Sequence, residues 1–272
     1  MLKSLLVTTA VQDSTIFNVL KVQDSLRYFI RFSYFGKNYH GWQRQPNAIT
    51  VQEVLEDCMS TLLREPIEVV GAGRTDTGVH AKEMFAHFDV ESIQDSGELI
   101  HRMNAFLPED IAIRDISPVE SDAHARFNAV ERTYEYWVVQ EKAPFYSDFA
   151  HFVKQDLDIG AMNEAASIFL KHSDFESFSK SNTDVKTFIC DIRKAEWSTE
   201  VDKLVFTISA DRFLRNMVRA IVGTLLEVGM GKRKPAEMKE ILKSKSRSEA
   251  GVSVPAKGLY LTQVLYPENI YA

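Results

Sequence analysis

The residues best suited to chemistry lie between Gly71 and Ala81, in the stretch Gly-Ala-Gly-Arg-Thr-Asp-Thr-Gly-Val-His-Ala. Asp76 offers a carboxylate, which could act as a nucleophile or a general base. Arg74 offers a guanidinium, which can bind phosphate or pair with a carboxylate. The flanking glycines let the backbone turn sharply or approach a ligand closely. A solvent-exposed loop without a function can have the same composition, so spacing alone leaves both interpretations open.

Several common sites can be excluded in this stretch. A dinucleotide-binding fingerprint would need a glycine where Asp76 stands, and a P-loop would need Lys-Ser or Lys-Thr where Val79 and His80 stand. The sequence also has no Gly-x-Ser-x-Gly motif of a serine hydrolase. His80 and His87 belong to no compact cysteine or histidine cluster, and His87 fits an ordinary strand histidine. We therefore expect no metal site.

A second candidate lies in the run Arg-Thr-Tyr-Glu-Tyr-Trp at 132–137. Side chains alternate along a strand, so Arg132, Tyr134 and Tyr136 are expected to face one way. Aromatic rings next to arginines can stack on nucleic acid bases and contact phosphate. Tyrosines can also pack in a core with their hydroxyls hydrogen-bonded, and we favour that interpretation for Tyr136.

A third candidate is a helix predicted over 213–228, where apolar residues recur at helical spacing. Arg212, Arg215 and Arg219 would lie on one flank of it and could follow a phosphate backbone. An ordinary solvated helix face is the alternative.

The surrounding elements alternate in a regular order. In the first half we expect strands at 27–34, 67–70, 85–90 and 111–116, and helices starting at Thr50 and spanning 97–106. In the second half we expect strands at 133–140, 186–197, 204–210 and 259–265, and helices at 159–171, 213–228 and 235–242. Each half reads β-α-β-β-α-β, the ferredoxin-like order. The prediction is an α+β fold of two ferredoxin-like halves with antiparallel or mixed sheets around a central cleft.

This order suggests two domains, 25–120 with the Asp76 loop and 121–272 with Tyr134 and the arginine-rich helix, after a poorly ordered extension at 1–24. The chain has 272 residues, of which 45% are hydrophobic and 26% charged, as in an ordinary soluble protein. Two distant cysteines indicate a reducing compartment, and no apolar run is long enough for a membrane span. We expect a cytoplasmic protein. The net charge of −6 does not by itself favour nucleic acid.

The run Gly73-Arg-Thr-Asp-x-Gly-Val-His-Ala81 stands among other distinctive stretches between about 27 and 267: Tyr-His-Gly-Trp-Gln at 39–43, Phe-Asn-Ala at 127–129 with Arg-Thr-Tyr-x-Tyr at 132–136, Phe-Leu-Arg-Asn-Met-Val-Arg at 213–219 and Gly-Leu-Tyr-Leu at 258–261. With these stretches in this order, the chain resembles the tRNA pseudouridine synthase A family, the tRNA pseudouridine(38–40) synthases. The run at 73–81 is similar to the signature loop of that family.

The resemblance implies an enzyme that isomerises uridines at positions 38–40 of the tRNA anticodon stem-loop, without a cofactor and as a homodimer. It implies that Asp76 is the catalytic aspartate and that Tyr134 stacks on the target uracil. It further implies that Arg219 pairs with the aspartate, that Arg74 helps to extrude the base, and that Leu259 forms an apolar wall of the uracil pocket.

The chemistry fits these residue types. The enzyme must break the glycosidic bond, turn the detached uracil and rejoin C5 to the sugar. A carboxylate could attack C1′, attack the ring or deprotonate the sugar, and the sequence does not choose among these.

The chain departs from the family pattern in two places. The extension before Arg27 lies outside the resemblance and has no assigned role. Position 77 is Thr77, where many members of the family carry alanine. The acidic net charge requires the arginines to gather on one face: Arg74, Arg126, Arg132, Arg212, Arg215 and Arg219.

Two other functions stay open from the sequence. A non-catalytic RNA-binding protein built from two RNA-recognition-like domains would have no use for Asp76 and would carry an aromatic RNP pattern that is absent here. A hydrolase that uses Asp76 would be expected to carry metal ligands or a catalytic triad.

Overall fold

A computed structural model describes residues 25–181 and 185–272. The predicted extension at 1–24 lies outside the described residues. The strands are β1 (Leu26–Tyr34), β2 (Val70–Gly71), β3 (His80–Val90), β4 (Ile111–Pro118), β5 (Glu131–Val139), β6 (His151–Phe152), β7 (Ile192–Thr199), β8 (Leu204–Ala210) and β9 (Leu259–Leu265). The helices are α2 (Val51–Leu63), α3 (Ser96–Phe106), α4 (Ile159–Ser167), α5 (Met217–Gly229) and α6 (Glu237–Ser244).

The strands form one continuous sheet in the order β4-β1-β3-β9-β5-β8-β7, with β2 beside β3 and β6 beside β5. Within each half, the four main strands follow the same antiparallel arrangement, β4-β1-β3-β2 in the first and β9-β5-β8-β7 in the second. The halves meet where β3 and β9 pair in parallel, at His80 with Tyr260 and Ala81 with Leu261. The α+β fold with two similar halves is therefore confirmed.

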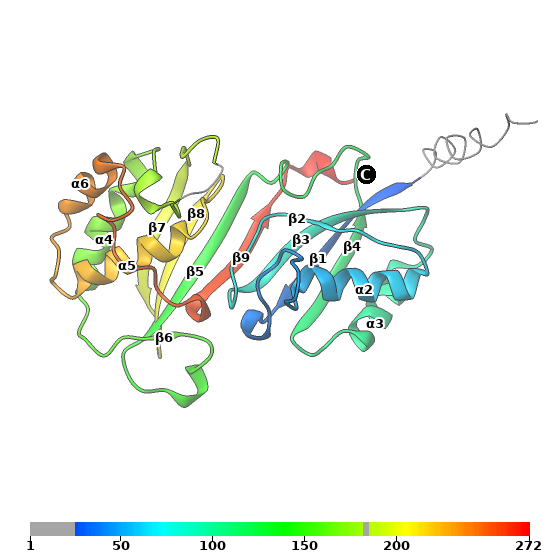
Figure 1. The fold of residues 1–272 in the computed structure, drawn as a ribbon, viewed down its shortest axis with the longest axis horizontal. Coiled ribbons are helices and arrows are strands. Elements are labelled where there is room, and N and C mark those ends of the chain that lie inside the picture. Colours follow the sequence, from blue (N-terminus) through cyan, green and yellow to red (C-terminus); the bar gives the residue numbers. More distant parts are fainter. Residues whose placement is uncertain (1–24, 182–184) are drawn as a thin grey trace, which may run out of the picture.

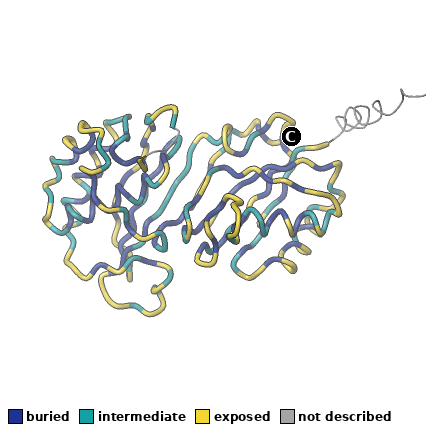
Figure 2. Tube along the Cα trace, in the orientation of Figure 1, coloured by how far each residue is buried: buried dark blue, intermediate teal, exposed yellow. Residues whose placement is uncertain are grey.

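The helices of the two halves lie at opposite ends of the molecule. In Figure 1, α4, α5 and α6 occupy one end, α2 and α3 the other, and β5 and β9 run between them. The first half has its own core around Phe29, Phe32 and Phe88, and the second half has another around Phe169 and Phe206. Figure 2 shows that buried positions concentrate on the strands and the inner helix faces, while the loops are exposed.

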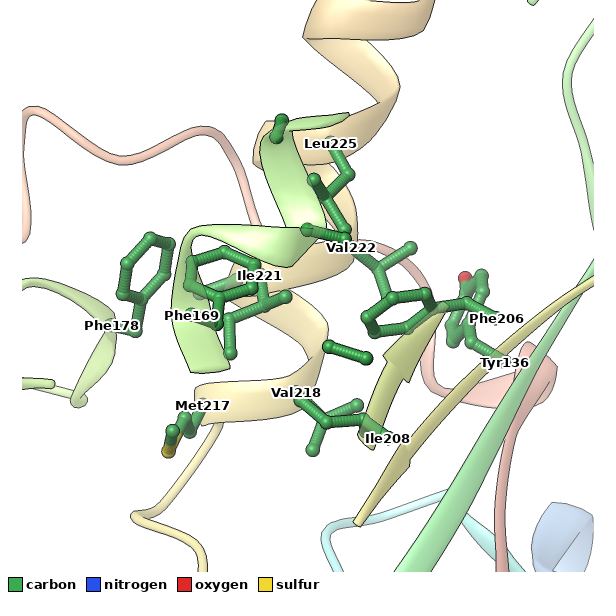
Figure 3. Close-up of a cluster of buried hydrophobic side chains, with 14 of the residues drawn as sticks. Tyr136, Phe169, Phe178, Phe206, Ile208, Met217, Val218, Ile221, Val222 and Leu225 are labelled. Atoms are coloured by element: carbon green, nitrogen blue, oxygen red, sulfur yellow. The ribbon is translucent and has the colours of Figure 1, made fainter. Parts of the chain in front are cut away.

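Local sequence signals explain where several helices begin. Thr50, where a helix was predicted to start, is the N-cap of α2, and its hydroxyl accepts a hydrogen bond from the Glu53 amide at 3.3 Å. Asp95 and Asp158 cap α3 and α4 in the same way. In Figure 3 the apolar side chains of α5, among them Ile221 and Val222, pack within the core of the second half.

Some predicted strands have different limits. Only Val70 and Gly71 pair as β2, because the amides of Ile67 and Val69 bond instead to the side chains of Ser60 and Glu56. The strand predicted at 85–90 begins at residue 80. The strand predicted at 186–197 begins at residue 192, because the preceding segment folds back on residues 173–175.

The helix predicted over 213–228 begins later, at Met217. Asn216 adopts a left-handed backbone conformation, with φ of 66°, which stops the helix from extending backwards. Its side-chain amide donates to Ser253 Oγ at 2.6 Å and holds this turn in place. Arg212 and Arg215 therefore precede the helix, and the prediction of three arginines on one helix flank is wrong.

No helix within 25–181 or 185–272 is long and apolar enough to cross a membrane.

Candidate functional site

Asp76 lies on the loop from β2 to β3, and this loop runs between the two halves. Val79 belongs to the core of the second half, whereas Ala81, two residues later, belongs to the core of the first. Gly78 has φ of 77°, which a glycine adopts without strain. The loop is thus anchored on both sides, and the carboxylate projects from a fixed backbone.

The segment before α2 supports this loop. The Trp42 amide donates to Thr75 O at 3.2 Å, and the Gly78 amide donates to Tyr39 O at 3.3 Å. Gly41 has φ of 91°, and a Cβ there would lie 2.5 Å from Thr75 O. Only glycine allows the two backbones to come this close.

A buried pair of hydroxyls lies beside the carboxylate. Tyr34 Oη and Thr75 Oγ1 are 2.7 Å apart, and both residues are buried. Burial raises the pKa of Tyr34 well above its usual range. This hydrogen bond fixes the residue next to Asp76 against β1, the central strand of the first half.

Two guanidiniums reach Asp76 from the second half. Arg219 Nη1 lies 3.3 Å from Asp76 Oδ2, and Arg219 Nε donates to Val254 O at 2.8 Å. Arg215 Nε lies 3.9 Å from the other carboxylate oxygen, with its side chain 61% exposed. The Arg219 and Asp76 side chains are 21% and 29% exposed, so this pair is partly shielded from water. Arg219 and Arg215 of the second half therefore fix the Asp76 carboxylate and balance its negative charge.

Tyr134 lies on β5, packs against both cores, and is half-buried. Its ring meets Phe213 edge to face, with the centroids 5.2 Å apart. Burial raises the pKa of Tyr134 to about 12, the Arg132 guanidinium lowers it and the Asp76 carboxylate raises it further. Its hydroxyl makes no hydrogen bond with any described residue. Aspartate, arginine and tyrosine, separated by up to 143 residues in sequence, thus occupy one region.

The remaining predicted residues lie around this region. Leu259 is buried in the core of the second half, opposite Tyr136 on β5. Arg74 is exposed and donates to Gln43 Oε1 at 3.2 Å, and within the described residues it forms no hydrogen bond or ion pair with Asp76. The structure therefore joins Arg219 to Asp76 directly, and it places Tyr134, Arg74 and Leu259 around them without such a bond.

Two arginines expected on a shared RNA-facing surface have other partners. Arg132 is half-buried, and its guanidinium donates to the carbonyls of Asp211 at 2.8 Å, Ala129 at 3.2 Å, Ala72 at 3.0 Å and Arg126 at 2.6 Å. Burial lowers its pKa. Arg212 Nη1 reaches Thr187 O at 3.4 Å. For Arg132, the expectation of an exposed phosphate-contacting side chain is wrong, because the strand directs it toward loop carbonyls.

Tyr136 is a core residue, as predicted. It is fully buried, its hydroxyl donates to Pro255 O at 2.8 Å, and its ring lies near Phe206 in Figure 3. His87 is likewise buried and accepts a hydrogen bond from the Ala125 amide. His80 is the first residue of β3 and accepts from the Gly36 amide. In the part of the chain that the structure describes, no group of three or more histidines, cysteines or carboxylates is arranged to hold a metal ion.

Comparison with known proteins places this chain in a family. The profile of a family described as "tRNA pseudouridine synthase" matches residues 30–128 and 165–267. The chain is 51% identical over 246 residues to the tRNA pseudouridine synthase A of Parabacteroides distasonis, covering 90% of this chain and 98% of that protein. The chain belongs to the tRNA pseudouridine synthase family.

Other members of the family are similar over nearly the same share of the chain. The tRNA pseudouridine synthase A of Bacteroides thetaiotaomicron is 51% identical over 249 residues, covering 90% of this chain and 93% of that protein. The protein of the same name from Francisella tularensis is 38% identical over 243 residues, covering 89% and 94%. In the family profile, Asp76 lies in the first matched segment and Arg219 in the second, while Tyr134 lies between them.

Sequence reasoning missed three supports of the family's signature loop. It gave no role to Tyr34, although a hydroxyl on an apolar strand must find a partner when buried. It placed Arg215 on a phosphate-binding flank and not next to Asp76. It also did not anticipate that Gly41 allows the close contact with Thr75, which no spacing rule indicates.

Proposed function

We propose that this protein isomerises uridine to pseudouridine in tRNA, with Asp76 as the catalytic carboxylate. The observation that carries the proposal is the junction of the halves, where Arg219 Nη1 lies 3.3 Å from Asp76 Oδ2 and Tyr134 packs against both cores. The named relatives and the family profile support the reaction and the tRNA substrate.

The reaction exchanges one bond to the sugar for another. The bond between N1 of uracil and C1′ of ribose breaks, C5 bonds to C1′, and the proton lost from C5 is balanced by one gained at N1. No electrons are gained or lost overall, so acid–base and nucleophilic groups suffice. Asp76 can attack C1′, attack the ring or take a proton from the sugar, and all three use the same anchored carboxylate.

Arg219 positions Asp76 in this scheme. Its guanidinium is fixed to Val254 O by Nε and reaches the carboxylate through Nη1, so the carboxylate cannot rotate freely. Arg215 is more exposed and can turn from Asp76 to a substrate phosphate when RNA binds.

Tyr134 provides a face for the detached base. A uridine in a helical stem must leave the stack before its C1′ can be reached, and an aromatic ring compensates for the lost stacking. Leu259 is proposed as an apolar wall of the uracil pocket, and Arg74 as the residue that helps to extrude the base.

The finer assignments are proposals as well. We propose positions 38–40 of the anticodon stem-loop as the target, a cytoplasmic location, and a homodimer. The loop at 140–150 exposes Phe145 and Phe149, which supports a protein contact there. We also propose domains at 25–120 and 121–272. Two separate cores support this division, and only a few core residues cross it: Val79 in one direction, and Ala123, Ala125, Leu261, Val264 and Ile270 in the other.

A non-catalytic RNA-binding protein is not favoured, because the relatives are named as synthases over nearly their full length. The test is chemical mapping of pseudouridine in an unmodified tRNA transcript after incubation with the purified protein. We expect new pseudouridine at 38, 39 or 40 wherever the transcript has uridine. Binding of the transcript without any pseudouridine would support the binding protein instead.

A further inference from the structure

A polar pocket lies beside the signature loop, on the side of Arg74. Its volume is about 200 Å³. Its lining includes the side chains of Gln43, Arg74 and Arg126. The two arginines come from separate segments, one just before Asp76 and the other from the turn that leads into β5.

The charges of this pocket are of one sign. No carboxylate is among the lining residues, and within the described residues neither Arg74 nor Arg126 forms an ion pair. Arg44, in contrast, pairs with Glu56 at 2.9 Å and with Asp57 at 3.2 Å. Two guanidiniums without a protein counter-charge at one pocket match an anion such as a phosphodiester.

An exposed aromatic ring stands next to the same pocket. Phe127 directly follows Arg126 and is 74% exposed. The Arg126 guanidinium carbon lies 5.7 Å from its ring centroid, and the His124 ring lies 4.2 Å from it. The ring thus has a face open to solvent beside a guanidinium, and every nucleic acid base has a face that can stack on such a ring.

The turn that presents Phe127 is internally fixed. The Ala125 amide donates to His87 Nδ1, the Arg126 amide to His124 Nδ1, and the His124 amide to Asn128 Oδ1. A ring on a preordered turn loses little conformational freedom when a ligand stacks on it.

Arg132 joins this turn to the signature loop. Its Nη2 donates to both Ala72 O and Arg126 O, so the backbones that carry Arg74 and Arg126 are held together. The Cα atoms of Arg74 and Asp76 can be no more than about 7 Å apart, since they are two residues apart in the chain. The pocket is therefore lined by the same loop that carries the carboxylate.

We propose that this pocket and Phe127 form a second nucleotide subsite, which binds a nucleotide that flanks the target uridine. The phosphodiester lies between Arg74 and Arg126, and the base stacks on Phe127. The inference rests on the proposed function for the identity of the ligand as tRNA, and it adds a single-nucleotide contact outside the catalytic junction.

The experiment measures dissociation constants of an anticodon stem-loop RNA as a function of salt. The full-length chain with Asp76→Asn is the background, so that turnover does not alter the RNA. Phe127→Ala and Arg126→Ala are compared with Phe106→Ala and Arg102→Ala, matched exposed residues of α3. Thermal unfolding checks that each variant is folded.

We expect Phe127→Ala to weaken binding by about five- to a hundred-fold, the range for one stacked base, and Phe127→Tyr to restore it. Phe127→Ala should leave the salt dependence unchanged. Arg126→Ala should make the slope of log affinity against log salt shallower by about 0.7, the value for one phosphate of a single strand. The two α3 controls should bind like the background.

An RNA that lacks one base identifies the stacked nucleotide. Replacing one of the two nucleotides beside the target by an abasic ribose should weaken binding to the background protein and have no further effect on the Phe127→Ala variant. The proposal is overturned if Phe127→Ala binds like Phe106→Ala, or if Arg126→Ala leaves the salt slope unchanged. These readouts are affinities, so a wild-type protein that made no pseudouridine would refute the proposed function separately.

Discussion

Arg132 offers a sharp test of how the loops around the site are held. Its guanidinium donates to four backbone carbonyls, which belong to the signature loop, the turn before β5 and the segment before α5. Replacing Arg132 by methionine keeps most of the apolar stem and removes all four donors. The three segments then lose their common partner.

The size of the effect follows from these contacts. A hydrogen bond contributes a net of about 1 kcal/mol, and more when the donor is charged. Four such bonds would contribute about 4 kcal/mol to the free energy of unfolding. The net loss is smaller, because methionine carries no charge that must be desolvated when the site is partly buried. We therefore expect Arg132→Met to lower the free energy of unfolding by about 3 kcal/mol, and Arg132→Lys to fall between it and wild type, because a lysine lacks the planar fork.

Urea unfolding followed by circular dichroism measures this difference, with Arg102→Met as the matched control. Arg102 is exposed on α3 and has no ion pair among the described residues, so its replacement should change stability by less than about 0.5 kcal/mol. A loss below about 1 kcal/mol for Arg132→Met would refute the view that one guanidinium holds these segments together.

Three further outcomes follow from the site. Tyr134→Phe should keep most activity, whereas Tyr134→Leu should lower kcat/KM by about five- to a hundred-fold, the range for the loss of one stacked base. Equal activity of the two variants would argue against stacking. A lysine at position 219 cannot bond both Val254 O and Asp76, so Arg219→Lys should lower kcat/KM by about ten- to a hundred-fold, and Arg215→Lys should lower it less. Unchanged activity of Arg219→Lys would contradict the positioning role. Burial lowers the pKa values of His80 and His87 from 6.5 to about 4, so the unfolded chain binds protons that the folded chain does not, and stability should decrease as pH falls from about 6.5 towards 4. Each histidine should contribute up to about 1.4 kcal/mol per pH unit to this loss in the free energy of unfolding. If a His87→Gln variant lost stability with pH as steeply as wild type, His87 would not contribute to the loss.

The sequence predicted the elements whose causes are local. Thr50 begins a helix because its own hydroxyl caps it, and this can be read from residues three apart. The order of strands and helices in each half likewise follows from hydrophobic periodicity. The short β2 could not be predicted, because the amides of Ile67 and Val69 take side-chain partners from a different element.

The junction of the halves could not be derived from patterns. The parallel pairing of β3 with β9 joins residues about 180 apart, and no local signal specifies it. Asp76 and Arg219 are similarly distant, and only the family resemblance linked them before the structure. The alternation along β5 gave the direction of Arg132 but not its surroundings, which are carbonyls from three loops.

The central claim is that one anchored carboxylate carries the reaction. The most direct measurement is pseudouridine mapping of an unmodified tRNA transcript after incubation with wild type or Asp76→Asn, with RNA binding measured in parallel. We predict that Asp76→Asn binds the transcript like wild type and forms pseudouridine more than about a thousandfold more slowly. Turnover by Asp76→Asn at the wild-type rate would contradict the account.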